Sequence, residues 1–226
     1  MQTTIKVCIF FLFLNVKVNS FLFPVGQLIQ VIMLLVFQGI YTQLELSQIV
    51  NSWHQPWLDQ LCLFGTLLGD GTLIVLICFI VYYFKPELAV AMLLAYLISS
   101  GITQGLKHSI FVGYHRPLWH INNLNLQGYY LPENAERNLA NSFPSGHTTS
   151  AFAFFCVLSL YVEQNITKLV FLFLAFFVAF TRVYLLQHFV IDITVGSIIG
   201  TTVSLWVYYG LYQNGKLKWA MIKRNS

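Results

Sequence analysis

Long apolar stretches, separated by short polar segments, make up most of the chain. Each stretch runs for 17 to 24 residues with no more than two charged side chains. A helix needs about 20 apolar residues to cross the hydrocarbon core of a bilayer. The pattern therefore predicts an all-α protein, a bundle of six transmembrane helices over residues 21–42, 61–84, 88–106, 147–163, 167–186 and 189–212.

The polar segments suggest how the chain is divided. Residues 109–143 form the one long polar connection, between the third and fourth predicted spans. Residues 1–20 resemble a signal peptide without a clear cleavage site, and we expect an uncleaved lead-in. Residues 21–212 then form a single six-span domain, and residues 213–226 form a basic cytoplasmic tail.

The composition agrees with a membrane protein. Of the 226 residues, 57% are apolar and 9% are charged, whereas soluble domains average roughly 25% charged residues. The net charge of +4 comes from scattered lysines and arginines, with no basic run among aromatic residues, so we expect no nucleic-acid partner. The four cysteines stand singly in apolar stretches, which is typical of buried residues rather than of a metal site.

Lysine and arginine predict the orientation, because cytoplasmic segments are enriched in both. With six spans and a cytoplasmic N-terminus, eight of these residues would lie inside and four outside. We therefore expect both termini in the cytoplasm and the loop over residues 109–143 on the outer side of the membrane.

Ionisable and hydroxyl side chains gather at the outer ends of the predicted spans. Charged groups at membrane depth are costly, so each is a candidate for function. In chain order they are Lys107, Arg116, Ser145, His147, Arg182, His188 and Asp192.

The run Ser142-Phe143-Pro144-Ser145-Gly146-His147 stands directly before the fourth span. Pro144 favours a turn, and Gly146 lets a ligand approach the backbone closely. The first amides of a helix also attract an anion. The run suits an anion that exchanges a proton with a histidine; the alternative is that Ser145 is an ordinary helix cap.

His188 and Asp192 are four residues apart, so on a helix they share one face. An aspartate that accepts one imidazole N–H leaves the other nitrogen free as a nucleophile. Taken alone, however, this spacing favours a structural pair that joins two helix ends.

The cations decide which ligand suits the cluster. Two histidines and an aspartate could hold a metal ion. Lys107, Arg116 and Arg182 would each repel a unit positive charge by about 4 kcal/mol at 4 Å and an effective dielectric constant near 20. The same cations would attract a phosphate, and the planar arginine fork suits its oxygens. The cluster therefore favours a phosphate over a metal.

Three motifs together resemble those of the type-2 phosphatidic acid phosphatase superfamily. They are Lys107-x8-Arg116-Pro117, Pro144-Ser145-Gly146-His147 and Thr181-Arg182-x5-His188-x3-Asp192. Residues 51–59 and 69–71 also look like bacterial membrane members of that family. The lysine-to-arginine spacing is eight rather than the commoner six, and Thr181 stands where serine is usual.

The resemblance implies a role for each residue. His188 would attack phosphorus to form a phosphohistidine, Asp192 would orient it, and His147 would protonate the leaving oxygen and then activate water. No metal or cofactor is implied. The phosphate would be held by Lys107, Arg116, Arg182, the Ser145 hydroxyl and the Gly146 amide.

We therefore expect a lipid phosphatase of the bacterial inner membrane, with its site facing the periplasm or the outside. Undecaprenyl pyrophosphate is the first expected substrate, followed by phosphatidylglycerol phosphate and phosphatidic acid. The alternatives are a lipid phosphotransferase with the same intermediate, a vanadium-dependent haloperoxidase, against which six spans argue, and a non-catalytic lipid-binding protein. The oligomeric state stays open.

Two further predictions concern residues around the cluster. Asp70, an acid inside the second predicted span, either bonds the cations of the site or caps a helix broken between Gly69 and Gly71. His108, His115 and His120 lie beside Lys107 and Arg116 in the sequence. They either line the mouth of the site or are solvated loop residues, and we expect the latter.

Overall fold

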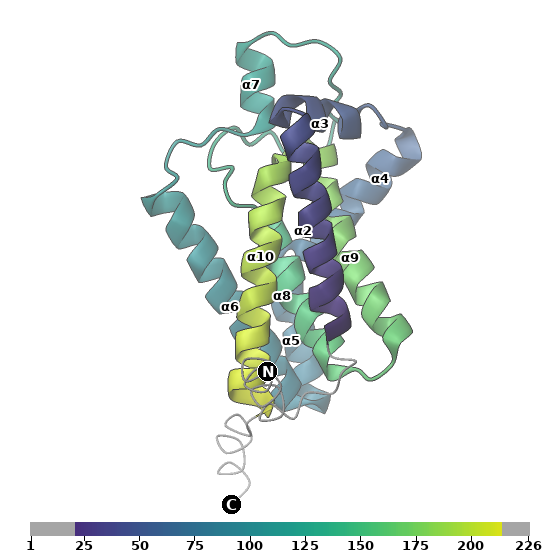
Figure 1. Ribbon diagram of the computed structural model, residues 1–226, viewed down its shortest axis with the longest axis vertical. Coiled ribbons are helices and arrows are strands. Elements are labelled where there is room, and N and C mark those ends of the chain that lie inside the picture. The colour runs from purple at the N-terminus through teal and green to yellow at the C-terminus, as the bar shows by residue number, and fades with distance from the viewer. Residues whose placement is uncertain (1–20, 214–226) are drawn as a thin grey trace, which may run out of the picture.

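The structure is a computed structural model that describes residues 21–213, with side chains described as far as Gly210. Its helices form an elongated bundle (Figure 1), and the described residues contain no β-strand, so the all-α prediction is confirmed for this part of the chain. The predicted lead-in and nearly all of the predicted basic tail lie outside the described residues. The main helices are α2 (Leu22–Ile40), α4 (Pro56–Gly65), α5 (Gly71–Phe84), α6 (Pro86–Ser109), α8 (Gly146–Tyr161), α9 (Asn165–Tyr184) and α10 (Val190–Val207).

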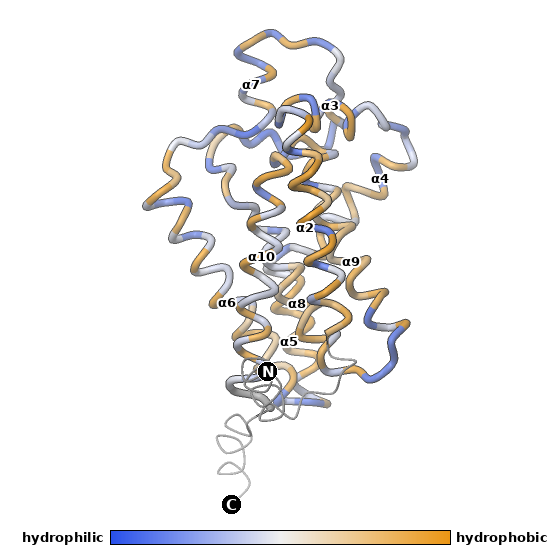
Figure 2. Tube along the Cα trace, in the orientation of Figure 1, coloured by the Kyte–Doolittle hydropathy of each residue, from blue (hydrophilic) through white to orange (hydrophobic). Residues whose placement is uncertain are grey.

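Shorter elements complete the bundle. Helix α3 (Gln43–Asn51) follows α2, and α7 (Pro117–Asn123) lies within the long polar connection. A 3-10 turn, η2 (Thr66–Gly69), follows α4, and a π-helical turn, η3 (Tyr208–Gln213), follows α10. Figure 2 shows apolar residues along the middle of the bundle and polar residues gathered towards its two ends.

Four helices are long and apolar enough to cross a membrane, namely α2, α6, α9 and α10 together with the start of η3. The pair Pro56–Gly69 and Gly71–Phe84 makes a fifth span if a helix bent by 58° is counted as one crossing. Helix α8 has only 16 residues. The described residues therefore contain four or five candidate spans, and the predicted count of six is not confirmed.

The second predicted span, residues 61–84, is not a straight helix, because the chain breaks at Asp70. Its carboxylate Oδ1 accepts hydrogen bonds from the backbone N–H groups of Thr72 at 2.8 Å and Leu73 at 3.4 Å. These are donors that the first turn of α5 cannot satisfy internally. Of the two predicted roles for Asp70, the structure therefore has the helix cap.

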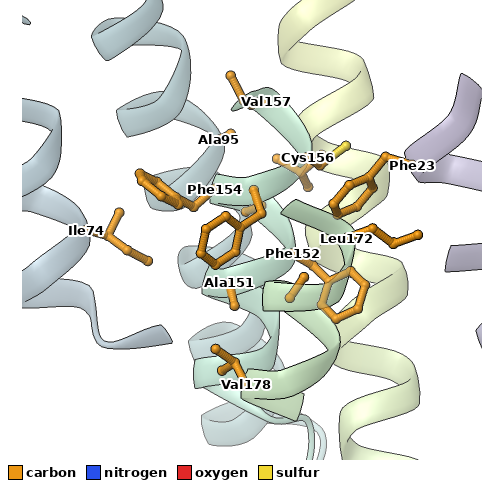
Figure 3. Packing of buried hydrophobic residues seen from close by; sticks show 14 of the residues in the cluster. Phe23, Ile74, Ala95, Ala151, Phe152, Phe154, Cys156, Val157, Leu172 and Val178 are labelled. Atoms are coloured by element: carbon orange, nitrogen blue, oxygen red, sulfur yellow. The ribbon is translucent and has the colours of Figure 1, made fainter. Parts of the chain in front are cut away.

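Helix α8 lies in the middle of the bundle and is buried over most of its length. It packs against α10, α9 and α6, and its phenylalanines alternate with alanines in the core (Figure 3). Glycines on α10 allow a close approach, since a Cβ atom at Gly200 would lie 2.5 Å from the Thr149 carbonyl oxygen and one at Gly196 would lie 2.9 Å from the Ser145 carbonyl oxygen. This packing brings the N-terminus of α8 against the beginning of α10.

The segment over residues 51–59 anchors the long polar connection. The Asn51 side-chain amide donates to the carbonyl oxygens of Tyr130 at 2.7 Å and Tyr184 at 2.9 Å, and it accepts from the Tyr130 N–H at 2.7 Å. The Tyr184 hydroxyl donates to the Asp59 carboxylate. The loop is thereby fixed to the end of α9, where several candidate site residues lie.

Candidate active site

A buried histidine–aspartate pair forms the centre of the site. His188 lies between α9 and α10, and its Nδ1 is 3.1 Å from Oδ2 of Asp192, in the first turn of α10. Each residue is 1% exposed. The same Asp192 oxygen accepts from the Ser142 hydroxyl and from the Phe189 N–H at 3.0 Å. The contact predicted from the four-residue spacing is confirmed.

A tight connection between α9 and α10 positions His188. Leu186 has a φ of +55°, a left-handed conformation that leucine rarely adopts. The His188 N–H donates to the Arg182 carbonyl oxygen at 3.1 Å. The turn therefore places the imidazole next to the end of α9, so that an arginine and a histidine six positions apart belong to one site.

The surroundings of His188 disfavour its charged form. Burial is the main cause that holds the pKa of His188 well below its ordinary value, and Arg116, Arg182 and Lys107 lower it further. The imidazole is therefore neutral near pH 7. With Nδ1 bonded to Asp192, Nε2 carries the free lone pair, as a nucleophile requires.

Arg116 reaches this centre from the long polar connection. Its Nε donates to the Ala140 carbonyl oxygen at 2.9 Å, and its Nη1 donates to Oε1 of Gln187 at 2.8 Å. Burial lowers the pKa of the guanidinium, whereas Glu136 and Asp192 raise it. An arginine stays charged under such opposing effects, so a fixed cation lies beside the histidine.

Arg182, in the last turn of α9, is 2% exposed. Its Nη1 donates to the Thr66 hydroxyl at 2.6 Å, and its Nη2 lies 3.4 Å from a carboxylate oxygen of Glu136. Its Nε is buried and has no partner among the described residues. The guanidinium therefore has a donor left over for a ligand.

Lys107 completes the set of three cations. It lies in the last turn of α6 and is 7% exposed. Its ammonium group interacts electrostatically with Arg116, Arg182 and Asp192. The unusual spacing of eight residues before Arg116 therefore does not keep this lysine away from the site.

The run around Pro144 joins the site at the N-terminus of α8. The Ser145 N–H donates to the Asp192 carbonyl oxygen at 3.1 Å. Ser145 Oγ lies 2.9 Å from the Thr148 hydroxyl and accepts from the Thr148 N–H at 3.4 Å, so Ser145 is indeed a helix cap. A Cβ atom added at Gly146 would meet no atom within 4 Å, which leaves its backbone open to a ligand.

His147 follows Gly146 in the first turn of α8. It lies close enough to the three cations to interact electrostatically with each of them, and it also interacts with His188. The structure therefore brings all eight residues predicted for the site to one end of the bundle.

Four further residues belong to the site and were missed by the sequence analysis as site residues. They are Thr66, Glu136, Ser142 and Gln187, which contact Arg182, Asp192 or Arg116. Only Ser142 and Gln187 had a signal, because they stand next to predicted motifs. Of the three neighbouring histidines, His108 is exposed in the last turn of α6, whereas His115 and His120 are partly exposed and pack against Trp119 and Phe189 respectively.

Together these groups favour a phosphate. Three buried cations interact electrostatically with a neutral histidine that has one free nitrogen, and the backbone at Gly146 is open at the start of α8. A dianionic group is attracted by such a cluster, whereas a cation is repelled by it.

Comparisons with known proteins agree with this geometry. The model of the PAP2 superfamily matches residues 88–216. The crystal structure of Aquifex aeolicus LpxE is similar with a TM-score of 0.62 and 27% identity, over 73% of this chain and 93% of that one. A transmembrane PAP2 type phosphatidylglycerolphosphate phosphatase from Bacillus subtilis has a TM-score of 0.60 and 21% identity, over 81% and 93% of the two chains. No curated protein matches the sequence.

The family match spans more than half of the chain and includes all eight predicted site residues, from Lys107 to Asp192. The fold is shared with two bacterial structures over nearly their whole length. The chain belongs to the PAP2 superfamily, the type-2 phosphatidic acid phosphatases that its three motifs resemble.

Proposed function

We propose that the protein hydrolyses a phosphomonoester or pyrophosphate of a membrane lipid through a phosphohistidine. The observation that carries this proposal is the buried pair of His188 Nδ1 and Asp192 Oδ2, 3.1 Å apart and surrounded by three cations. A structural pair needs no neighbouring cations, whereas a phosphate-accepting nucleophile does. Membership of the PAP2 superfamily supports the same reaction class.

In the first step, Nε2 of His188 attacks phosphorus. The N–P bond forms as the bond from phosphorus to the lipid oxygen breaks. Asp192 holds the imidazole in the required tautomer and stabilises the positive charge that develops on the ring. His147 donates a proton to the departing oxygen, which leaves as a neutral hydroxyl.

In the second step, His147 acts as the base. It takes a proton from a water molecule, whose oxygen attacks the phosphohistidine, and the N–P bond breaks to release inorganic phosphate. Both histidines then return to their starting protonation states. The same residue thus serves as acid and base because the second step retraces the geometry of the first.

The phosphate oxygens would be held by the three cations, the Ser145 hydroxyl and the Gly146 amide. Ser145 accepts from the Thr148 N–H and also lies next to the Thr148 hydroxyl. The Thr148 hydroxyl is the donor in that contact, so the Ser145 proton can point to a phosphate oxygen. Fixed donors of this kind stabilise charge that builds up in the transition state, and we propose that no metal is required.

The architecture supports a site at the membrane boundary. We propose six crossings, which are the five candidate spans and α8. Because α8 is enclosed by other helices, it can cross the membrane with fewer residues than a helix that faces lipid. The described chain then starts and ends at the same end of the bundle (Figure 1). If both terminal segments of the sequence lie on that side, eight lysines and arginines fall there and four on the other side. This count favours a cytoplasmic position for that end and an outward-facing site in a bacterial inner membrane.

The substrate and the acceptor define the alternatives. Undecaprenyl pyrophosphate, phosphatidylglycerol phosphate and phosphatidic acid all carry a phosphate at the depth of the site. A phosphotransferase shares the first step and differs only in the acceptor of the second. A lipid-binding protein without activity would not need the His188–Asp192 pair.

The test is phosphate release by the purified protein in detergent from these three lipids, with EDTA present and no acceptor added. We expect release from at least one lipid, reduced at least roughly 1,000-fold in His188→Ala. Labelled phosphate from a radioactive substrate should remain on the alkali-denatured wild-type protein and be absent from His188→Ala.

His108→Ala is the matched control, because His108 is an exposed histidine in the last turn of α6. It should keep wild-type activity. Release that appears only with an added acceptor lipid would establish the transferase instead. Loss of activity with EDTA, restored by a divalent ion, would contradict the metal-independent reaction.

A further inference from the structure

A cavity of about 180 Å³ lies on one side of His147, between the start of α5, the outer half of α6 and the first turns of α8. It is separate from the residues that hold Arg116 and Arg182. Its lining is Gly69, Gly71, Tyr96, Ser100, Thr103, Gln104, Gly146, His147 and Ser150.

The reaction geometry gives this cavity a role. In an in-line displacement the leaving oxygen departs on the side of phosphorus opposite to the nucleophile. His147 must lie beside that oxygen to protonate it. Because His147 and Gly146 line the cavity, the part of the lipid attached to the leaving oxygen would extend into it.

The lining is polar, and apart from His147, the proposed general acid, it carries no charged side chain. Its side chains supply hydroxyl groups from Tyr96 and Ser100 and an amide from Gln104, and it contains no lysine, arginine or carboxylate. A hydroxyl and an amide each offer both a donor and an acceptor. A ligand group that can both donate and accept hydrogen bonds matches these side chains best. A hydroxyl can do both, whereas phosphate and ester oxygens only accept.

The backbone at the start of α5 is shaped around these groups. A Cβ atom at Gly71 would overlap the Tyr96 hydroxyl, and one at Gly69 would lie 2.6 Å from the His147 carbonyl oxygen. Tyr96 and His147 can therefore approach the break between η2 and α5 only because both positions are glycine. Gln104 is exposed on a candidate span, where an unpaired amide is costly.

We infer that the cavity binds a neutral, hydroxyl-bearing moiety next to the leaving oxygen of a lipid phosphomonoester, such as a glycerol, and that Tyr96, Ser100 and Gln104 determine this specificity. The inference rests on the proposed function and selects among its substrates. In a pyrophosphate the leaving oxygen belongs to a second anionic phosphate, which would lie in the cavity, where no lysine or arginine offsets its charge. In phosphatidylglycerol phosphate a neutral glycerol separates the leaving oxygen from the anionic phosphodiester. A diacylglycerol leaving group would offer only ester oxygens and leave the donors of the cavity partly unsatisfied.

The experiment compares kcat/KM of the full-length protein in detergent for three lipids. In phosphatidylglycerol phosphate the leaving oxygen belongs to a glycerol that carries a free hydroxyl. In phosphatidic acid it belongs to diacylglycerol, which has no free hydroxyl, and in undecaprenyl pyrophosphate it belongs to a second, charged phosphate. We expect the first to be preferred over both others. Ser100→Ala, Tyr96→Phe and Gln104→Leu should each reduce the preference over phosphatidic acid about threefold to tenfold, as expected for one lost hydrogen bond.

Ser99→Ala is the matched control for Ser100→Ala. Ser99 is the neighbouring residue on α6, is fully buried, and donates to the Tyr96 carbonyl oxygen without lining the cavity. It should leave the ratio of the two kcat/KM values unchanged. An unchanged ratio in all three cavity variants would overturn the inference.

The two proposals fail in different ways. If the wild-type protein hydrolyses phosphatidic acid or undecaprenyl pyrophosphate as well as phosphatidylglycerol phosphate, the headgroup inference is wrong and the phosphatase proposal stands. If none of the three lipids is hydrolysed by folded protein, the proposed function fails, and the inference fails with it.

Discussion

The two sides of His147 carry different kinds of side chain. On one side lie the buried His188–Asp192 pair and three cations. Two of these cations, Arg116 and Arg182, are held in place by the hydrogen bonds that they donate to protein oxygens. On the other side lies the cavity of Tyr96, Ser100 and Gln104, which carries no fixed charge and includes an exposed amide. The proposed general acid stands at the boundary between them.

This difference separates two tasks. The phosphate side has to place a nucleophile, its orienting acid and three positive charges with little tolerance, because electrostatic stabilisation depends on fixed geometry. The cavity side has to recognise the rest of the lipid, for which a few neutral hydrogen bonds are enough. Changes on the first side should therefore affect the rate for every substrate, whereas changes on the second should alter the choice among substrates.

The largest expected effect comes from Asp192→Asn. The asparagine amide would donate to Nδ1 of His188 and move the ring proton to Nε2, which then cannot attack phosphorus. We expect kcat to fall by about three orders of magnitude for all lipids, as when the orienting acid of another catalytic histidine is removed. The measurement is phosphate release at saturating substrate.

Asp59→Asn is the matched control for this change. Asp59 is also a buried aspartate and accepts a hydrogen bond from Tyr184, but it lies outside the phosphate side. It should retain activity within a few-fold. If Asp192→Asn lost activity towards only one lipid, the proposed division between the two sides would be wrong.

The second prediction concerns pH. Burial and the neighbouring cations hold the pKa of His188 well below its ordinary value of 6.5. His188 therefore stays neutral as the pH falls through 6.5, and it becomes protonated only near its lower pKa in the folded protein. At pH 5.5 a histidine with the ordinary pKa would be only about one-tenth neutral, so we expect kcat/KM to exceed that one-tenth level clearly.

The measurement is kcat/KM between pH 5 and pH 8, with the ionisation of the substrate phosphate determined separately by NMR and divided out. An acid limb centred at pH 6.5 or above would contradict the lowered pKa of His188 that burial and the neighbouring cations predict.

Much of this arrangement could be predicted from the sequence. The apolar runs predicted the positions of α2, α6, α9 and α10 to within a few residues, and the four-residue spacing predicted that His188 and Asp192 are in contact. Both are local properties. Helix length and i,i+4 contacts depend on neighbouring residues and hardly on the rest of the fold.

Other features depend on contacts that no local pattern reveals. An apolar run does not distinguish a straight span from one bent by 58°, and Asp70 between two glycines was the only signal of the break. Glu136 and Thr66 are ordinary loop and helix-end residues until the fold brings them to Arg182. The cavity is likewise formed by three separate elements, so its lining could not be predicted.

The third prediction tests how Glu136 affects the phosphate side. Its carboxylate, on a side chain that is 53% exposed, lies 3.4 Å from Arg182 Nη2, where a phosphate oxygen would compete with it. Glu136→Gln should therefore tighten inhibition by inorganic phosphate about threefold to fivefold, the equivalent of a partly exposed ion pair. The hydrogen bond that the Gln187 side-chain amide donates to the Glu136 backbone carbonyl oxygen is unaffected by this change.

Glu133→Gln serves as the control, since Glu133 is an exposed carboxylate of the same loop and is not among the partners of Arg182. It should leave the inhibition constant unchanged. Equal shifts in both variants would indicate a general effect of loop charge rather than competition at Arg182.

The smallest expected effect concerns Asp70, which shapes the cavity side through the start of α5. Asp70→Ala removes the cap from the first turn and should lower the free energy of unfolding by about 1 kcal/mol, whereas Asp70→Ser keeps a capping oxygen and should lose less. Thermal unfolding in detergent measures both. Because Gly69 and Gly71 flank the cap and line the cavity, the alanine variant should also show a weaker preference for the hydroxyl-bearing lipid than the serine variant. If both variants lose kcat equally and keep that preference, the carboxylate acts through its charge on His147, and the cap does not contribute to recognition.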